Sequence, residues 1–282
     1  MKGHTPGPRP CHTAFMQSTP TMPPLESLRL FDSCMTFGEF VFAACPARIT
    51  RENVVATLDR YGIAEALVQH ELARTVHPRR DGNLLLMEQI RGIPRLHPVW
   101  VVEPPRDGGR AASRRMAGEL RDAGVRAARL PFRSVTPFGW LWHDLLAELE
   151  ARRVPCFCDF GGVSTLGELT DADVAGLREI ASMHPRLPLV VSHVMGGLGV
   201  HPALPPLVRQ MRNLRLDVSG IMDFARVIAR EAGPRKVLFA TGAPFADPGL
   251  LVGTVQYDHD LDDEAKRLIC GDNLRTLLEE AR

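Results

Sequence analysis

The chain has 282 residues, of which 45% are hydrophobic and 24% charged, and its formal net charge is +1. This balance excludes an intrinsically disordered chain. The near-neutral charge argues against a nucleic-acid partner, which would require a basic excess or a dense basic patch. No apolar run approaches the roughly 20 residues of a membrane span. We therefore expect a globular protein with neither a membrane nor a nucleic-acid partner.

Residues 1–24 are rich in Pro, Thr and His and lack the apolar segment of a secretory signal. The six cysteines contain no C-x-x-C pair and are sparse for this length, which is typical of reduced thiols. These features predict a cytoplasmic protein. Residues 1–26 are expected to form a flexible, proline-rich leader, and residues 27–282 a single domain.

Apolar runs of strand length alternate with amphipathic stretches along the rest of the chain. The runs are rich in Val, Leu and Phe, which is typical of buried parallel strands. In order they are Arg29–Met35, Ile63–Gln69, His97–Glu103, Val125–Leu130, Pro155–Phe160, Pro188–Val194, Leu214–Ser219 and Val237–Thr241. The helical stretches are Thr50–Tyr61, Arg110–Ala123, Leu141–Arg152, Asp171–His184, Ala203–Arg212, Phe224–Glu231 and Asp262–Leu278. Thr170 is the predicted N-cap of the helix that starts at Asp171.

This alternation of eight strands with helical segments predicts an α/β fold. A (β/α)₈ TIM barrel, folded as a single domain, fits both the pattern and the length. A doubly wound open sheet is the alternative, but the chain lacks that fold's glycine-rich phosphate fingerprint after the first strand.

Polar residues gather where the predicted strands end. In a parallel barrel the reactive groups lie at the carboxyl ends of the strands, on side chains that alternation directs inward. The candidates are Asp32, Cys34 and Thr36 on the first strand, Arg129 on the fourth, Asp159 on the fifth, His193 on the sixth, Asp217 and Ser219 on the seventh, and Thr241 on the eighth. A set of His, Asp, Cys and Arg side chains supports acid–base chemistry on a polar or anionic substrate.

Each candidate also has a purely structural interpretation. His193 can be a hydrogen-bonded core group, and Asp217 can bond the backbone beside it. Cys34 can be a small buried hydrophobe. Arg129 can bind a substrate carboxylate through two parallel hydrogen bonds, or it can pair with Asp159.

An aromatic segment follows the fourth strand. Trp140 and Trp142 can wall the mouth of a site or pack the following helix, and His143 is an additional polar group there.

Five fragments occur in the order in which one family carries them. Residues 31–38 (FDSCMTFG) are similar to an opening D-x-H-x-H strand, and residues 192–197 (SHVMGG) to an H-x-G-G element. Residues 216–220 (LDVSG), 237–245 (VLFATGAPF) and 269–274 (ICGDNL) are similar to that family's seventh strand, its L-F-G-T-D-x-P segment and its closing G-x-N-A helix. From residue 30 to residue 278 the chain therefore resembles the amidohydrolase-related family of metal-dependent TIM-barrel hydrolases.

The chain departs from the family pattern at the metal. The resemblance implies two histidines on strand one, one each on strands five and six, and an aspartate on strand eight. Cys34, Thr36, Asp159 and Gly242 occupy four of these positions, and only His193 matches. We therefore expect no metal and no cofactor. A zinc site built from Cys34, Asp159 and His193 is the alternative, since all three are competent donor types.

Together these observations predict a metal-independent, amidohydrolase-like hydrolase of lactonase type. It would hydrolyse a small, carboxylated lactone or cyclic amide, or decarboxylate an acid. Arg129 would hold the substrate carboxylate, His193 would polarise the carbonyl or transfer a proton, and Asp159 would activate water. The expected substrate-binding residues are Cys34, Thr36, Trp140, His143, Asp217 and Thr241.

A second interpretation is a degenerate pseudoenzyme that binds a metabolite or a partner subunit, because a barrel does not need its metal to pack. Relatives of this kind commonly assemble, so a homo-oligomer is a further expectation.

Overall fold

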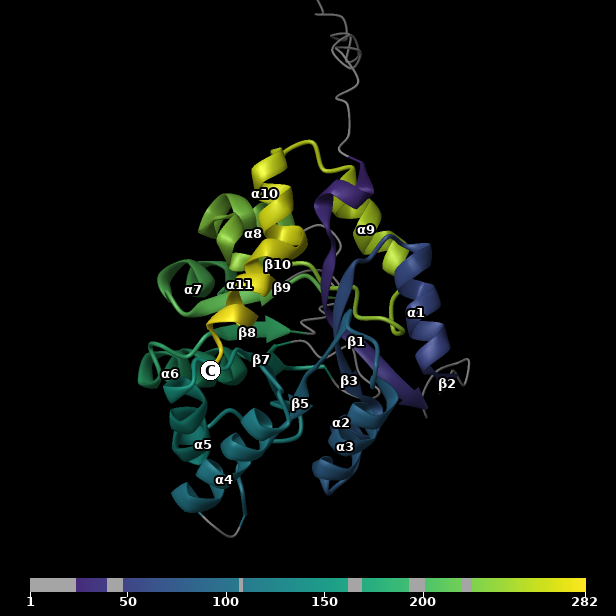
Figure 1. The fold of residues 1–282 in the computed structure, drawn as a ribbon. Helices are drawn as coiled ribbons and strands as arrows, with labels where there is room; N and C mark the ends of the chain where they lie inside the picture. Colours follow the sequence, from purple (N-terminus) through teal and green to yellow (C-terminus); the bar gives the residue numbers. More distant parts are fainter. Residues whose placement is uncertain (1–23, 40–47, 107–108, 162–168, 193–200, 220–224) are drawn as a thin grey trace, which may run out of the picture.

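The computed structural model describes residues 24–39, 48–106, 109–161, 169–192, 201–219 and 225–282 (Figure 1). Its strands are β1 (Phe31–Glu39), β2 (Arg48–Ile49), β3 (Glu65–His70), β4 (Leu96–Pro98), β5 (Trp100–Val101), β6 (Ala128–Leu130), β7 (Cys156–Asp159), β8 (Leu189–Ser192), β9 (Leu214–Asp217) and β10 (Val237–Leu238).

Its α-helices are α1 (Arg51–Arg60), α2 (Glu71–Thr75), α3 (Arg79–Gln89), α4 (Gly109–Asp122), α5 (Gly139–Ala151), α6 (Asp171–Met183), α7 (Leu204–Gln210), α8 (Ala225–Ala232), α9 (Pro248–Gln256), α10 (Asp263–Arg267) and α11 (Asn273–Glu280). Two short 3₁₀ segments, η1 (Leu25–Leu28) and η2 (Pro234–Lys236), and one π-helical turn, η3 (Leu268–Asp272), complete the described chain. None of the helices in these ranges is both long and apolar enough to cross a bilayer.

The strands close into a barrel. One sheet has the order β2-β1-β3-β4 and the other β10-β9-β8-β7-β6-β5, and every pair except β1–β2 is parallel. Val99, between β4 and β5, donates its N–H to the carbonyl of Val68 on β3 (2.9 Å), so β4 and β5 share one strand position. At the other seam Ser33 donates to Phe239 (3.0 Å). The predicted eight-stranded TIM barrel is therefore confirmed.

Each predicted strand and helix corresponds to one or more observed elements. The structure also contains elements that the sequence pattern did not predict. Helices α2, α3 and α9 and the short strand β2 are the additions. Helix α9 contains two glycines and a proline, which usually disfavour helix. Pro248 is tolerated because it stands in the first turn, and Asp247 caps that turn by accepting the N–H of Gly249 (2.8 Å). The predicted N-cap Thr170 accepts the N–H of Asp173 (3.2 Å), so it is confirmed.

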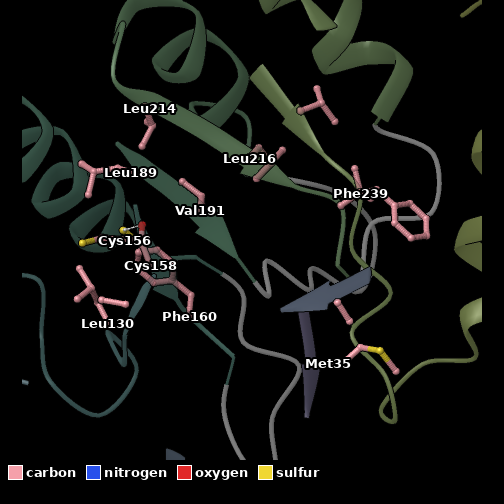
Figure 2. Close-up of a cluster of buried hydrophobic side chains, with 14 of the residues drawn as sticks. Met35, Leu130, Cys156, Cys158, Phe160, Leu189, Val191, Leu214, Leu216 and Phe239 are labelled. Atoms are coloured by element: carbon pink, nitrogen blue, oxygen red, sulfur yellow. Dashed lines mark hydrogen bonds between the residues drawn. The ribbon is translucent and has the colours of Figure 1, made fainter. Parts of the chain in front are cut away.

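The hydrophobic core has two layers, separated by the barrel wall. Alternation along β7 sends Cys156 and Cys158 outward against the helices and Phe157 inward. Figure 2 shows the outer layer, in which Leu189 and Val191 of β8 lie beside the two cysteines. The inner layer also contains side chains of α11, which are Leu274, Leu277 and Leu278. Helix α11 therefore closes the amino-terminal end of the barrel and leaves its chemistry to the carboxyl end.

The cysteines in the described ranges are Cys34, Cys156, Cys158 and Cys270, and all four are buried thiols. Burial raises the pKa of Cys270 to about 12, which makes that thiol inert. Cys11 and Cys45, and most of the predicted leader, lie outside the described residues.

Close packing of α2 against α3 depends on Gly82. A Cβ added there would stand 2.7 Å from the Cα of Ala73 and 2.8 Å from the carbonyl carbon of Leu72. We expect Gly82→Ala to lower the free energy of unfolding by about 1–3 kcal/mol, because the backbone of α2 must move. The matched control is Gly118→Ala in α4, where nothing lies within 4 Å of the added atom. That change should raise stability by about 0.5–1 kcal/mol. Urea unfolding measures both, and equal effects would contradict the packing argument.

Candidate functional site

Arg129 occupies the centre of the barrel's carboxyl half. Its neighbour Ala128 packs outward, so alternation along β6 turns Arg129 inward, where only 1% of it is exposed. Its Nη1 donates to the Ser192 hydroxyl (3.0 Å), and its Nη2 donates to the Ser33 carbonyl (3.3 Å). The guanidinium lies 5.3 Å from the ring centroid of Phe157. Its Nε is buried without a hydrogen-bond partner among the residues described. Arg129 is therefore a fixed cation in the barrel interior, and its Nε–H is a donor that no described residue accepts.

Asp159, at the end of β7, lies between two guanidinium groups. Its Oδ2 is 3.6 Å from Nη1 of Arg129 and 3.5 Å from Nε of Arg74, while its Oδ1 accepts the N–H of Gly161 (2.9 Å). The Asp159 side chain is 5% exposed. Two cations at this distance stabilise the carboxylate form, which is the form that a general base requires.

Arg74 is a site residue that the sequence did not predict. It lies on α2, which follows β3, and its Nη1 donates to Glu71 (3.0 Å). Burial alone would lower the pKa of Arg74, but the carboxylates of Asp159 and Glu71 raise it above its usual value. No alternation rule finds this residue, because it stands on a five-residue helix and not on a strand.

The Ser192 hydroxyl connects Arg129 to Asp217. The Ser192 hydroxyl, which accepts from Arg129, donates to Oδ2 of Asp217. The other carboxylate oxygen accepts both the N–H (3.0 Å) and the hydroxyl of Ser219. Asp217 therefore bonds the backbone beside it and also orients the serine that holds Arg129.

Asp32 is a third buried carboxyl group in the same region. Its Oδ1 accepts the N–H groups of Cys34 (2.9 Å) and Thr241 (2.9 Å), and its Oδ2 accepts the Thr241 hydroxyl. Burial, with a smaller contribution from the charge of Asp217, raises the pKa of Asp32 to about 7 despite these hydrogen bonds. The group can therefore exchange a proton near neutral pH.

The first strand does not follow simple alternation. Its register against β3 shifts between Asp32 and Met35, as in a β-bulge. Thr36 consequently pairs with Gln69, whose Nε2 donates to the Thr36 hydroxyl (3.1 Å). Cys34, whose N–H donates to Asp32 (2.9 Å), is buried. Thr36 and Cys34 thus line the same end of the barrel as the arginines.

Two predicted substrate-binding residues do not join this cluster. Trp140 is 74% exposed in the first turn of α5, where it stacks on Phe138 at 6.1 Å. His143, one turn further along α5, is exposed, and its ring lies 5.2 Å from that of His184 in the outer helical layer. The helical period of α5 carries both side chains away from the buried cluster, and their predicted substrate-binding role stays a prediction. Trp142 is fully buried, as the packing interpretation expects.

His193 follows directly after β8 and lies outside the described residues, so its predicted catalytic role stays a prediction.

The described side chains do not fit a divalent metal. No three His, Cys, Asp or Glu side chains in these ranges converge as ligands would. Both oxygens of Asp159 already face cations or an N–H group, and a dication there would meet the guanidinium groups of Arg74 and Arg129. The alternative zinc site also needs His193, whose placement is not described.

Comparison with known proteins places this geometry in context. A family model described as amidohydrolase matches residues 41–279. The solved structure of the 5-carboxyvanillate decarboxylase LigW from Sphingomonas paucimobilis is similar, with a TM-score of 0.70 at 13% identity, covering 89% of this chain and 99% of that one. A 2,6-dihydroxybenzoate decarboxylase from Rhizobium superposes with a TM-score of 0.65 at 14% identity, covering 89% and 98%.

A third solved structure is a dihydroxybenzoic acid decarboxylase from Polaromonas, with bound manganese and the inhibitor 2-nitroresorcinol. Its TM-score is 0.66 at 13% identity, covering 89% of this chain and 96% of that one. At these identities the likeness establishes the fold. No curated protein sequence matches the chain.

Proposed function

The chain belongs to the amidohydrolase family, and from this premise we propose that it is a metal-independent hydrolase of a small carboxylated lactone or cyclic amide. The active site comprises Arg129, Asp159 and His193, with Arg74 as an additional cation. Cys34, Thr36, Asp217 and Thr241 line the site around the substrate.

The observation that supports this function best is the state of Arg129. A buried donor without an acceptor costs free energy, and proteins usually retain one only where a ligand or a function uses it. The Arg129 guanidinium is held by Ser192 and Ser33, so it is fixed before a substrate arrives. A substrate carboxylate or a developing oxyanion is the acceptor that such a fork favours.

The reaction follows from these positions. Asp159 accepts a proton from water as the water oxygen attacks the substrate carbonyl carbon. The carbonyl oxygen becomes an oxyanion, which the Arg129 guanidinium stabilises. The tetrahedral intermediate then breaks its bond to the ring oxygen or nitrogen, and that leaving atom takes a proton from His193. The proton on Asp159 restores His193, which balances the cycle.

Decarboxylation is the second candidate reaction. The solved decarboxylases described above share the fold over 89% of this chain, which favours an aromatic acid as an alternative substrate class. In that reaction Arg129 would orient the departing carboxylate and a protonated side chain would supply the proton that replaces carbon dioxide. The two candidates differ in product, because hydrolysis consumes water and decarboxylation releases carbon dioxide.

A substrate panel with and without chelator tests this proposal. We expect the purified protein to turn over at least one carboxylated lactone or cyclic amide at a rate that a chelator leaves unchanged. Asp159→Asn and His193→Ala should each lower kcat by about 10²–10⁴-fold, because each removes a proton-transfer group. Asp122→Asn, an exposed carboxylate on α4, is the matched control and should retain full activity.

The outcomes separate the alternatives. Full activity in both Asp159→Asn and His193→Ala would exclude the assigned site, and loss of activity with chelator would exclude metal independence. Carbon dioxide release from aromatic acids would favour decarboxylation. Binding of panel compounds without turnover of any would favour the pseudoenzyme.

A further inference from the structure

A basic cavity lies at the amino-terminal end of the barrel, opposite the candidate active site. Its volume is about 590 Å³, and it lies between the end of α5, the turn that precedes β9 and the last residues of the chain. Five arginines line it, namely Arg153, Arg186, Arg212, Arg215 and Arg282. The N–H of Arg282 donates to the carbonyl of Arg152 (2.8 Å), which places the end of the chain beside α5, as Figure 1 shows.

The carboxylates of the cavity neutralise only part of this charge. Glu280 accepts from Arg153 (2.5 Å), and Glu150 lies 3.8 Å from Nε of Arg186. Within the described ranges, no carboxylate oxygen lies within 4.0 Å of the guanidinium of Arg212 or Arg215. The cavity therefore carries unmatched positive charge.

Arg215 belongs to a strand of the barrel and not to a surface loop. It lies on β9 two residues before Asp217, so alternation turns it toward the barrel interior, at the amino-terminal mouth. It is half-buried. Burial lowers the pKa of Arg215; the charge of Glu280 opposes this shift and the charge of Arg153 adds to it, but no described carboxylate is close enough to Arg215 to form an ion pair.

Lys236 adds a further cation behind the arginines. Its Nζ donates to the carbonyls of Met211 (2.8 Å), Arg212 (3.0 Å) and Leu214 (3.0 Å), which fixes it against the turn that precedes β9. Burial and the charges of Arg215 and Arg212 lower the pKa of Lys236 to about 8. Like charges are thus held together by the fold, and an anion in the cavity would relieve their repulsion.

We propose that this cavity binds a small polyanion that carries two or more phosphate or carboxylate groups, with Arg212 and Arg215 as its principal ligands. The planar fork of arginine matches both anions. The volume is that of a small-molecule site, for which about 300–1,000 Å³ is usual. A nucleic acid would need a longer basic surface than a chain of net charge +1 provides. The proposal does not depend on the proposed hydrolase activity.

Calorimetric titration of the whole chain at constant ionic strength tests the site. The probes are inorganic pyrophosphate and citrate, with sodium chloride as the reference. We expect saturable one-to-one binding of at least one polyanion and a rise in Tm, because the ligand binds the folded state alone. Tighter binding of pyrophosphate would identify a phosphate ligand, and tighter binding of citrate a polycarboxylate.

Two variants and one control decide the assignment. Arg215→Met and Arg212→Ala should each weaken binding by about tenfold or more, as expected for the loss of a charge-assisted hydrogen bond. Arg212 is exposed, so its removal leaves the fold intact even if Arg215→Met disturbs β9. Arg121→Met on α4, where the side chain pairs with Asp122 (2.7 Å), is the control and should bind normally. The site is disproved if both cavity variants bind like wild type, or if chloride raises Tm as much as the polyanions do.

Discussion

Replacement of Arg129 by methionine is expected to lower the free energy of unfolding by about 3–5 kcal/mol. The reason is that Asp159 and the Ser192–Asp217 pair would lose the cation that faces them in a region almost without solvent. A chemical denaturation series measures the change directly. The same variant should abolish turnover, because it removes the buried Nε–H that Arg129 keeps without a described partner.

Two companion variants separate charge from geometry. Arg129→Lys keeps the charge but loses the planar fork, so it should recover part of the stability and little of the activity. The double variant Arg129→Met with Asp159→Leu removes both ions, and part of the lost stability should return, since a buried ion pair is often replaceable by apolar groups. The return should be incomplete, because the buried Arg74 also loses its contact with Asp159. A loss below 1 kcal/mol in Arg129→Met would mean that the pair contributes little to the fold.

The second large effect is a pH dependence of stability caused by Asp32. Its pKa rises from 3.8 in the unfolded chain to about 7 in the folded protein, so the folded state holds the proton more tightly. The resulting stabilisation is complete below about pH 4 and is lost as the pH rises through about 7. The two pKa values correspond to a change on the order of 4 kcal/mol over this range.

Asp32→Asn should remove this dependence. The asparagine carbonyl can still accept the N–H groups of Cys34 and Thr241, and its amide carries no charge to desolvate. Relative to wild type, the variant should gain stability steadily between about pH 4 and pH 7, and the difference should then level off. Unfolding curves at a series of pH values provide the measurement, with the exposed Asp122→Asn as a control that should run parallel to wild type. A constant difference between Asp32→Asn and wild type would show that Asp32 is ionised throughout.

The positions of the strands were predictable from the sequence, because buried parallel strands are runs of apolar residues. The inward faces of β6, β7 and β9 were predictable because successive side chains of a strand point to opposite faces. Arg129, Asp159 and Asp217 were found by that rule, and the structure brings them together. The rule failed on β1, where a register shift interrupts the alternation.

Strand alternation could not identify Arg74, because that residue lies on a short helix and not on a strand. The position of such a helix depends on tertiary packing. Trp140 and His143 were assigned from their nearness in sequence to a strand end. The direction of both side chains is set by the helical geometry of α5, which directs them outward.

The seam between β1 and β10 has a consequence for how the chain reaches its fold. Asp32 and Thr241 are separated by 209 residues in sequence, yet they bond to each other directly. Contacts of such sequence separation form late, because the chain loses entropy when it closes so long a loop before it gains the contact. During synthesis the edge of β1 that contacts this segment therefore stays unpaired until nearly the whole chain has left the ribosome. That edge is where a stalled or truncated chain would aggregate.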